Sequence, residues 1–90
     1  MFYVYVLWSN KLQKRYVGFT SDLTKRLSEH NSGKSPFTKN GLPWKLIYSE
    51  DYRMEIDARK RENILKSGVG RKFLDSQLLK KIDAGVSALG

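Results

Sequence analysis

The stretch Phe2-Tyr-Val-Tyr-Val-Leu-Trp8, together with Arg15-Tyr-Val-Gly-Phe-Thr20, decides the fold of this chain. Both segments are dominated by β-branched and aromatic residues, which favour strands. The polar segment from Ser9 to Lys14 breaks the run and is short enough to join the two strands as an antiparallel hairpin. We therefore expect a hairpin at the start of the chain, to which the later elements are added.

Alternation along the first strand produces two apolar faces. The residues of one face are Phe2, Val4, Val6 and Trp8, and those of the other are Tyr3, Tyr5 and Leu7. Neither face is polar, so we expect this strand to be covered on both sides. The hairpin can place Tyr5 and Tyr16 side by side on one face, while the register of pairing is left open by the sequence.

The composition indicates one small, basic domain. The 90 residues include 17 Lys and Arg against nine Asp and Glu, for a net charge of +8, and no cysteine. The lack of cysteine excludes disulfides, thiolate metal sites and cysteine nucleophiles, and suits a cytoplasmic protein. The initial apolar run is too short to span a bilayer and lacks the features of a signal peptide. A basic surface favours polyanions, most commonly nucleic acid, although many small basic proteins are merely soluble.

A short helix is predicted from Ser21 to His30. Ser21 or Asp22 can cap it, Leu23 and Leu27 form its apolar stripe, and residues 31–33 (Asn-Ser-Gly) end it. Arg26 and His30 lie one turn apart and therefore point to the same side, next to the leucine stripe. The sequence then predicts a mobile basic loop from Ser32 to Pro43. A third strand follows from Trp44 to Ser49, which the acidic pair Glu50-Asp51 ends.

A longer helix is predicted from Arg53 to Lys66, with a packing stripe formed by Met54, Ala58, Arg61 and Leu65. Glu62 lies at the border of this stripe, which is an unusual position for a glutamate. The segment from Ser67 to Gly70 stops the helix, and a final helix runs from Arg71 to Asp83 with Leu74, Leu78 and Ile82 pointing inward. The sequence thus predicts a single domain over residues 1–83 and a frayed tail over residues 84–90.

Several of these segments, taken in order, resemble the GIY-YIG endonuclease superfamily. The first triplet is Tyr3-Val4-Tyr5, with tyrosine in place of the name-giving glycine, and the second is Tyr16-Val17-Gly18, with valine in place of isoleucine. Residues 22–31 match the family's helix with its arginine and histidine. Residues 58–62 match the later helix with its single metal-binding glutamate. The resemblance extends over residues 2–74.

This resemblance implies an α+β fold with a small three-stranded antiparallel sheet flanked by helices. It also implies an endonuclease that hydrolyses phosphodiester bonds with one divalent cation, Mg²⁺ or Mn²⁺. By resemblance, Tyr5 and Tyr16 contact the attacking water and the scissile phosphate, Arg26 neutralises the transition state, and Glu62 holds the metal. His30 assists proton transfer or positions phosphate.

These residue types suit phosphoryl transfer. A guanidinium with fixed donors stabilises charge on the non-bridging oxygens, and Mg²⁺ needs only one carboxylate in addition to water and substrate oxygens. A tyrosine is a poor base at its ordinary pKa of about 10, whereas a histidine titrates near 6.5. The general base is therefore Tyr16, as the family implies, or His30.

Each residue also has an ordinary structural explanation. The tyrosines are typical strand aromatics, Arg26 and Lys25 fit a solvated helix face with Lys25 pairing to Glu29, and His30 fits a helix cap or a surface position. Glu62 has a partner one turn away in Lys66. Singly, these explanations are favoured; the ordered set favours an active site.

The sequence-based hypothesis is thus a metal-dependent endonuclease acting on DNA with little sequence specificity, in DNA repair, recombination or processing. The expected phosphate contacts are Lys34, Lys39, Arg59, Lys60, Arg71 and Lys72. Two alternatives remain: a catalytically weak nucleic-acid-binding module, and a nuclease subunit that needs a protein partner or a second copy of itself. Three nearby residues, Ser67, Arg71 and Lys72, are candidates for the polar residue that some family members place after the glutamate helix.

Overall fold

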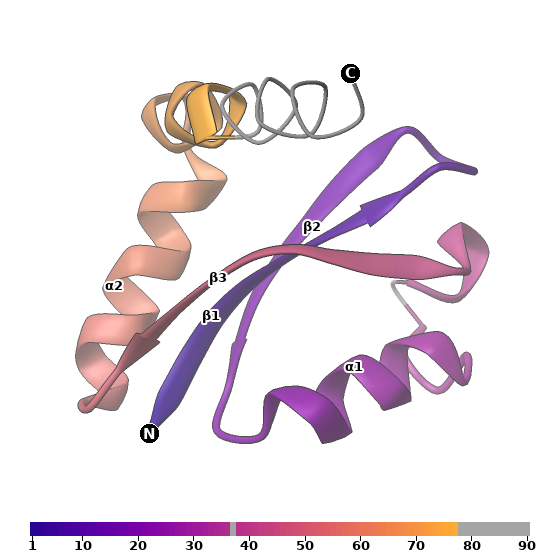
Figure 1. Ribbon diagram of the computed structural model, residues 1–90, viewed down its shortest axis with the longest axis horizontal. Coiled ribbons are helices and arrows are strands. Elements are labelled where there is room, and N and C mark those ends of the chain that lie inside the picture. The colour runs from indigo at the N-terminus through magenta and orange to yellow at the C-terminus, as the bar shows by residue number, and fades with distance from the viewer. Residues whose placement is uncertain (37, 78–90) are drawn as a thin grey trace, which may run out of the picture.

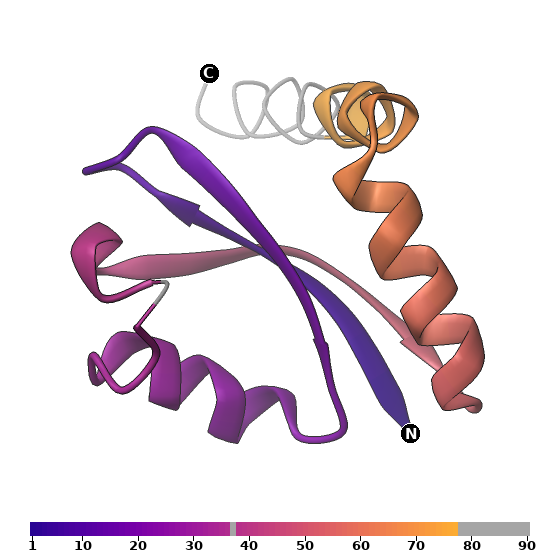
Figure 2. The same ribbon diagram turned by 180° about the vertical axis from the view of Figure 1, so that it is seen from behind.

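The computed structural model describes residues 1–36 and 38–77, which form a three-stranded antiparallel sheet with helices on both faces (Figure 1). Strand β1 (Phe2–Ser9) lies between β2 (Lys14–Thr20) and β3 (Trp44–Tyr52). Helix α1 (Leu23–Asn31) and helix α2 (Glu55–Lys66) lie on opposite sides of the sheet, as the reverse view also shows (Figure 2). This architecture confirms the predicted fold class.

The central strand β1 is buried on both faces, as its sequence predicts. Val4 and Val6 are fully buried against α2, in a cluster with Ala58, Leu65 and Leu74. Tyr5 and Leu7 are buried on the other face with Trp44, and Leu23 and Leu27 of α1 pack against them. The two faces of one strand thus hold the two halves of the core together, and fix α1 and α2 relative to each other.

Helix α1 begins at Leu23 because Asp22 caps it. The Asp22 side chain accepts a hydrogen bond of 3.1 Å from the backbone N–H of Lys25. The loop that follows contains a short 3₁₀ helix, η1 (Lys39–Gly41). The prediction of a mobile loop is not supported at Ser35 and Thr38, since both are buried.

Strand β3 is longer than predicted, because the acidic pair does not end it. Glu50 is half-buried within the strand, where its carboxylate accepts hydrogen bonds from Arg61 at 2.9 and 3.1 Å and from the hydroxyls of Tyr48 and Tyr52. A carboxylate with this many donors can occupy a strand facing a helix. Arg61 lies on the side of α2 that packs against the sheet, as predicted, and is there as the ion-pair partner of Glu50.

The ends of α2 also differ from the prediction. Met54 is 59% exposed and only precedes the helix, so its assignment to the buried stripe is wrong. At the other end, the break is confined to Ser67, and residues 68–77 are already helical. Ser67 Oγ accepts a hydrogen bond of 3.3 Å from the N–H of Gly70 and so caps the new helix. Gly70 packs on the backbone of Leu65, where a Cβ would lie 2.3 Å from the Leu65 Cα.

The last predicted features lie mostly outside the described residues. Leu74 is 1% exposed and points into the core, as expected. Leu78, Ile82 and the tail over residues 84–90 are beyond residue 77. In the described part of the chain, no helix is both long enough and apolar enough to cross a membrane.

Candidate active site

The site begins with a close contact between the two strands of the hairpin. Tyr5 of β1 is paired with Gly18 of β2, and Leu7 is paired with Tyr16. The Tyr5 phenol lies over Gly18 so closely that a Cβ there would be 2.6 Å from Tyr5 Oη and 2.7 Å from Cζ. Only glycine leaves space for this ring, which gives the glycine of the second triplet a steric role.

Tyr16 lies diagonally across the pair on the same face as Tyr5. Its ring centroid is 6.3 Å from that of Tyr5, 5.0 Å from that of His30 and 6.2 Å from that of Trp44. Tyr16 is half-buried, whereas Tyr5 is 2% exposed. The hairpin therefore brings the two tyrosines together as the sequence predicts, and leaves Tyr16 the more accessible of the two.

His30 is fully buried, so its interpretation as a surface residue is wrong. Its Nε2 lies 3.0 Å from Tyr5 Oη, and its Nδ1 lies 2.8 Å from Thr38 Oγ1. Either neutral tautomer satisfies both hydrogen bonds. Burial lowers the His30 pKa, and the positive charge of Arg26 lowers it further. The imidazole is therefore a neutral link between Tyr5 and the loop.

Thr38 is the site residue that sequence analysis missed. No motif marks it, and it lies in a segment that was interpreted as a mobile loop. Its backbone oxygen also accepts a 2.6 Å hydrogen bond from Trp44 Nε1, which ties the loop to β3. The available signal was indirect, because a buried histidine requires a partner for each ring nitrogen.

Arg26 reaches the same tyrosines from α1. Its guanidinium interacts with the hydroxyls of both Tyr5 and Tyr16; burial alone would lower the Arg26 pKa, but these contacts raise it. The side chain is 34% exposed and forms a long ion pair of 3.9 Å with Glu29. Among the residues described, Glu29 therefore pairs with Arg26, and its expected pairing with Lys25 is absent.

The environment keeps Tyr5 protonated. Burial raises the pKa of its phenol, Arg26 lowers it, and the nearby Tyr16 and Glu62 raise it, with a net rise. A phenol with a raised pKa is a neutral hydrogen-bonding group at pH 7. Tyr5 is thus suited to hold a partner in place and poorly suited to accept a proton from water.

Glu62 lies on α2, where the buried Ala58 and Leu65 set the orientation of the helix, and its negative charge raises the pKa of Tyr5. Its side chain is 17% exposed and forms an ion pair of 3.3 Å with Lys66. The ordinary explanation of Glu62 as a partner of Lys66 is therefore realised in the structure. The pair does not cancel the effect of Glu62 on the site, since its negative charge still raises the pKa of Tyr5.

The Glu62 carboxylate is suited to a hard divalent cation that takes few ligands from the protein. No group of three or more His, Cys, Asp and Glu side chains that could hold a metal occurs in residues 1–36 and 38–77. Mg²⁺ is commonly held by one or two carboxylates, with water and phosphate oxygens completing its shell. Glu62 supplies one such carboxylate, provided that the Lys66 amine moves away from it.

The predicted phosphate contacts are all exposed and come from three separate segments of the chain. Lys34 and Lys39 lie in the loop after α1, while Arg59 and Lys60 lie on α2. Arg59 is paired with Glu55 at 3.1 Å and stacks over the Phe19 ring at 5.3 Å. The remaining two predicted contacts, Arg71 and Lys72, follow the break at Ser67.

Comparison with known proteins identifies the family of this chain. The model of the GIY-YIG catalytic domain matches residues 1–73, which include both triplets, Arg26, His30 and Glu62. The chain therefore belongs to the GIY-YIG family, a family of nucleases.

Its relatives include small proteins named UPF0213. One from Listeria welshimeri is 36% identical over 80 residues, covering 88% of this chain and 87% of the relative. One from Streptococcus pneumoniae is 42% identical over 52 residues. The matches to this and three other streptococcal and lactococcal relatives span only 52% to 59% of their lengths. The solution structure of a UPF0213 protein from Bacillus halodurans shares 28% identity, with a TM-score of 0.53, and the match covers 86% of this chain and 85% of that one.

Proposed function

We propose that this chain is a divalent-metal-dependent endonuclease that hydrolyses phosphodiester bonds in DNA. One observation carries the proposal: Arg26 interacts with the hydroxyls of both Tyr5 and Tyr16, while Glu62 lies near enough to act on the Tyr5 pKa. These four groups come from four different elements. Together they supply a cation, two hydroxyls and a carboxylate, the groups that phosphodiester hydrolysis requires.

Arg26 stabilises the charge that develops on the phosphate. Phosphoryl transfer places negative charge on the non-bridging oxygens, and a guanidinium offers several donors in a fixed plane. Its interactions with two phenols hold it in position before the substrate binds. Loss of such a group commonly reduces the rate by on the order of 10² or more.

Tyr16 positions the attacking water, and His30 acts through Tyr5. Both nitrogens of His30 are engaged at hydrogen-bond distance inside the core, so the imidazole does not face the substrate. It fixes the Tyr5 hydroxyl, which in turn contacts Arg26. His30 is accordingly a positioning residue, and of the two candidate bases Tyr16 is the one with an accessible side chain.

Glu62 would hold one Mg²⁺ or Mn²⁺. The ion, when bound, neutralises charge on the phosphate oxygens and the leaving group. Lys66 orients the carboxylate in the free protein through their ion pair. On substrate binding, the lysine is free to pair with a phosphate instead.

The DNA is held through its backbone. Lys34, Lys39, Arg59, Lys60, Arg71 and Lys72 are the proposed contacts, since all are exposed cations. Contacts to phosphate carry little sequence information, so we propose weak sequence specificity and a general role in DNA repair or processing in the cytoplasm.

The test is a cleavage assay on plasmid, single-stranded and branched DNA with Mg²⁺ or Mn²⁺, with EDTA as the metal-free control. Glu62→Ala and Arg26→Ala should abolish cutting while retaining DNA binding. Arg53→Ala removes an exposed arginine just before α2 and should cut like the wild type. Cutting that persists in EDTA or in the Glu62 variant would refute the proposal.

The Glu62–Lys66 ion pair favours a second candidate, a nucleic-acid-binding module with weak catalysis. A carboxylate already neutralised by a lysine binds a cation less readily. This candidate predicts salt-sensitive DNA binding by the wild type, no cutting, and the same affinity for Glu62→Ala. Recovery of activity on adding a protein partner would instead indicate a partner-dependent subunit.

A further inference from the structure

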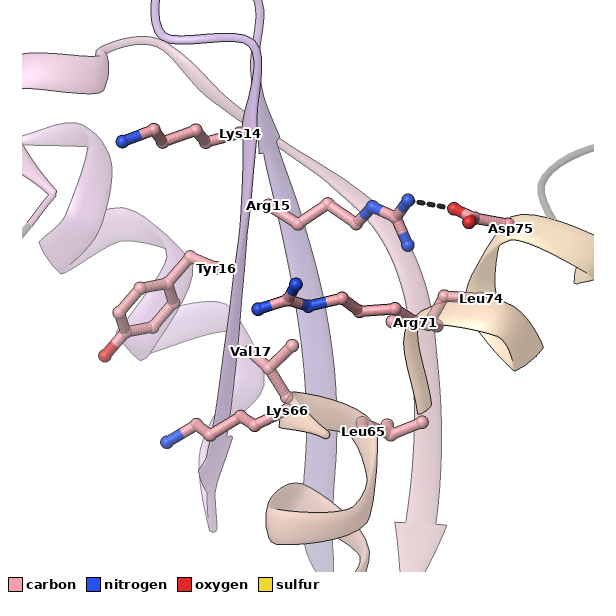
Figure 3. Close-up of a pocket in the computed structure, with 9 residues that line it drawn as sticks. All are labelled: Lys14, Arg15, Tyr16, Val17, Leu65, Lys66, Arg71, Leu74 and Asp75. Carbon is pink, nitrogen blue, oxygen red and sulfur yellow. Dashed lines mark hydrogen bonds and ion pairs between the residues drawn. The ribbon is translucent and has the colours of Figure 1, made fainter. Parts of the chain in front are cut away.

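A pocket of about 580 Å³ lies between β2 and the segment that follows α2 (Figure 3). Its β2 side is formed by residues 14–17 and its other side by residues 65–75. Strand β2 is an outer strand of the sheet, so the pocket opens at the sheet edge rather than inside the core. A volume of this size is typical of small-molecule sites and exceeds the needs of a single bound ion.

The lining is strongly basic. Lys14, Arg15, Lys66 and Arg71 contribute four cations, and the carboxylate that lines the pocket, Asp75, is paired with Arg15. Counting that pair as neutral leaves three cations, Lys14, Arg71 and Lys66, of which Lys66 is paired with Glu62 outside the lining. The pocket therefore selects an anion.

Arg15 has a donor without an acceptor. Its Nη2 bonds to Asp75, but its Nη1 is buried and has no hydrogen-bond partner within the described chain. A buried donor in this state is costly, and native proteins rarely leave one unsatisfied. An anionic oxygen entering the pocket would satisfy it.

The floor is apolar. Val17, Leu65 and Leu74 line it, and the half-buried Val17 offers more accessible surface than the two buried leucines. A site that accepts inorganic phosphate alone has no use for such a surface. Cations above an apolar floor instead fit a ligand with a phosphate at one end and a sugar or base at the other.

The pocket is continuous with the proposed active site through two residues. Tyr16 lines the pocket and belongs to the tyrosine pair, and Lys66 lines the pocket and forms the ion pair with Glu62. In Figure 3 the charged ends of Lys14, Lys66 and Arg71 point to the side on which the Tyr16 ring lies. A strand leaving the pocket would thus pass directly to Tyr16 and Glu62.

We propose that this pocket binds a nucleotide of the substrate strand next to the scissile phosphate. The phosphate contacts Arg15 and Arg71, Lys14 contacts a neighbouring phosphate of the same strand from the Tyr16 side of β2 (Figure 3), and the sugar or base packs on the apolar floor. Lys66 exchanges Glu62 for the phosphate, which frees the carboxylate. The inference rests on the proposed function, because it assigns a further contact to the same substrate. Of the four cations, only Arg71 was among the contacts predicted from sequence.

The first test is binding of a labelled single-stranded oligonucleotide in EDTA, measured by fluorescence anisotropy over a series of salt concentrations. Arg71→Gln and Lys14→Gln should each weaken binding about ten-fold and reduce the salt slope by about one. Arg53→Gln and Lys45→Gln remove the same charges at exposed positions outside the pocket and should have less effect. Equal losses in pocket and control variants would overturn the proposal.

Asp75→Asn should change the affinity for the oligonucleotide in the opposite direction. It removes the carboxylate that occupies Arg15 and should tighten binding several-fold, whereas Asp51→Asn, on the far strand β3, should not. Weaker binding by Asp75→Asn, or an equal gain from Asp51→Asn, would count against a specific pocket.

A second measurement locates the ligand. Titration of the labelled protein with a 5′-phosphorylated thymidine dinucleotide, followed by NMR, should shift the amides of residues 14–17 and 65–75. Shifts confined to other residues would overturn the inference even if the enzyme cuts DNA. Shifts in the pocket without any cutting would support the pocket and refute the proposed nuclease activity.

Discussion

A methyl group added at Gly18 tests the packing on which the site depends. In Gly18→Ala, the new Cβ would lie 2.6 Å from Tyr5 Oη and 2.7 Å from Cζ, where an ordinary contact is at least about 3.4 Å. The Tyr5 ring must therefore move by roughly 1 Å. That movement stretches the 3.0 Å contact between Tyr5 Oη and His30 Nε2.

The size of the effect follows from three contributions. Overpacking a tight site costs about 1–3 kcal/mol, and disturbing a buried hydrogen bond costs about 1 kcal/mol more. Replacing glycine by alanine in a strand regains roughly 0.5–1 kcal/mol of backbone entropy. The cost of the clash exceeds the entropy gain, so we expect the free energy of unfolding to fall by about 2–3 kcal/mol. For a domain of this size, the melting temperature should then be lower by roughly 10–20 °C. Misplacing Tyr5 and Arg26 should also lower the cleavage rate by about 10².

The assay combines urea unfolding, to measure the free energy, with DNA cleavage below the melting temperature. Gly68→Ala is the matched control, since its Cβ meets nothing within 4 Å and it lies at the start of a helix, so its stability should stay the same or rise slightly. In a Tyr5→Leu background the phenol is gone, and Gly18→Ala should cost less. Unchanged stability and activity in Gly18→Ala would refute the reasoning.

Three further predictions concern the elements around the site. Asp22→Ala removes the cap of α1 and should lower the free energy of unfolding by about 1 kcal/mol in urea titrations. Because the His30 pKa is lowered in the folded protein, the unfolded chain takes up the proton first; stability should fall as the pH drops below about 6.5, and His30→Gln should lack this component. Burial raises the Glu50 pKa, but hydrogen bonds from Arg61 and two tyrosines lower it overall. Glu50 therefore stabilises the fold above its ordinary pKa, and this stability should be lost as the pH falls through the lowered value; Glu50→Gln should abolish that dependence and cost about 1–3 kcal/mol at pH 7.

Each of these has an outcome that contradicts it. Ser21→Ala is the control for the cap, and an equal loss in both variants would mean that Asp22 does not act as one. A wild-type stability that is flat between pH 7 and 5 would contradict a buried neutral His30. For Glu50, an acid transition that is identical in the wild type and Glu50→Gln would show that other carboxylates control it.

Most of the hairpin and of α1 was predictable because their sequence patterns involve residues that are close together in the chain. Alternation along β1 identified a strand covered on both faces, and the spacing of Arg26 and His30 on α1 predicted their common side. The register was not predictable, since any shift of the pairing by two residues keeps the tyrosines on one face. The observed pairing of Tyr5 with Gly18 follows from sterics that only the folded sheet reveals.

The errors occurred where distant partners decide the structure. Glu50 was taken as the end of a strand because an isolated carboxylate disfavours one, but Arg61 lies opposite it in the fold. Thr38 was overlooked because its partner, His30, is provided by a neighbouring helix. The role of Gly70 depends on its contact with the preceding turn, whereas glycine in a sequence usually indicates a helix end.

The most direct test of the central claim compares Arg26→Gln with Arg53→Gln in a plasmid cleavage assay with Mg²⁺. Both substitutions remove one arginine charge, but only Arg26 interacts with the two tyrosine hydroxyls. If these residues form the active site, Arg53→Gln should cut like the wild type and Arg26→Gln should be slower by about 10² or more, with DNA binding largely retained. Equal cutting by both variants would contradict the assignment of this site.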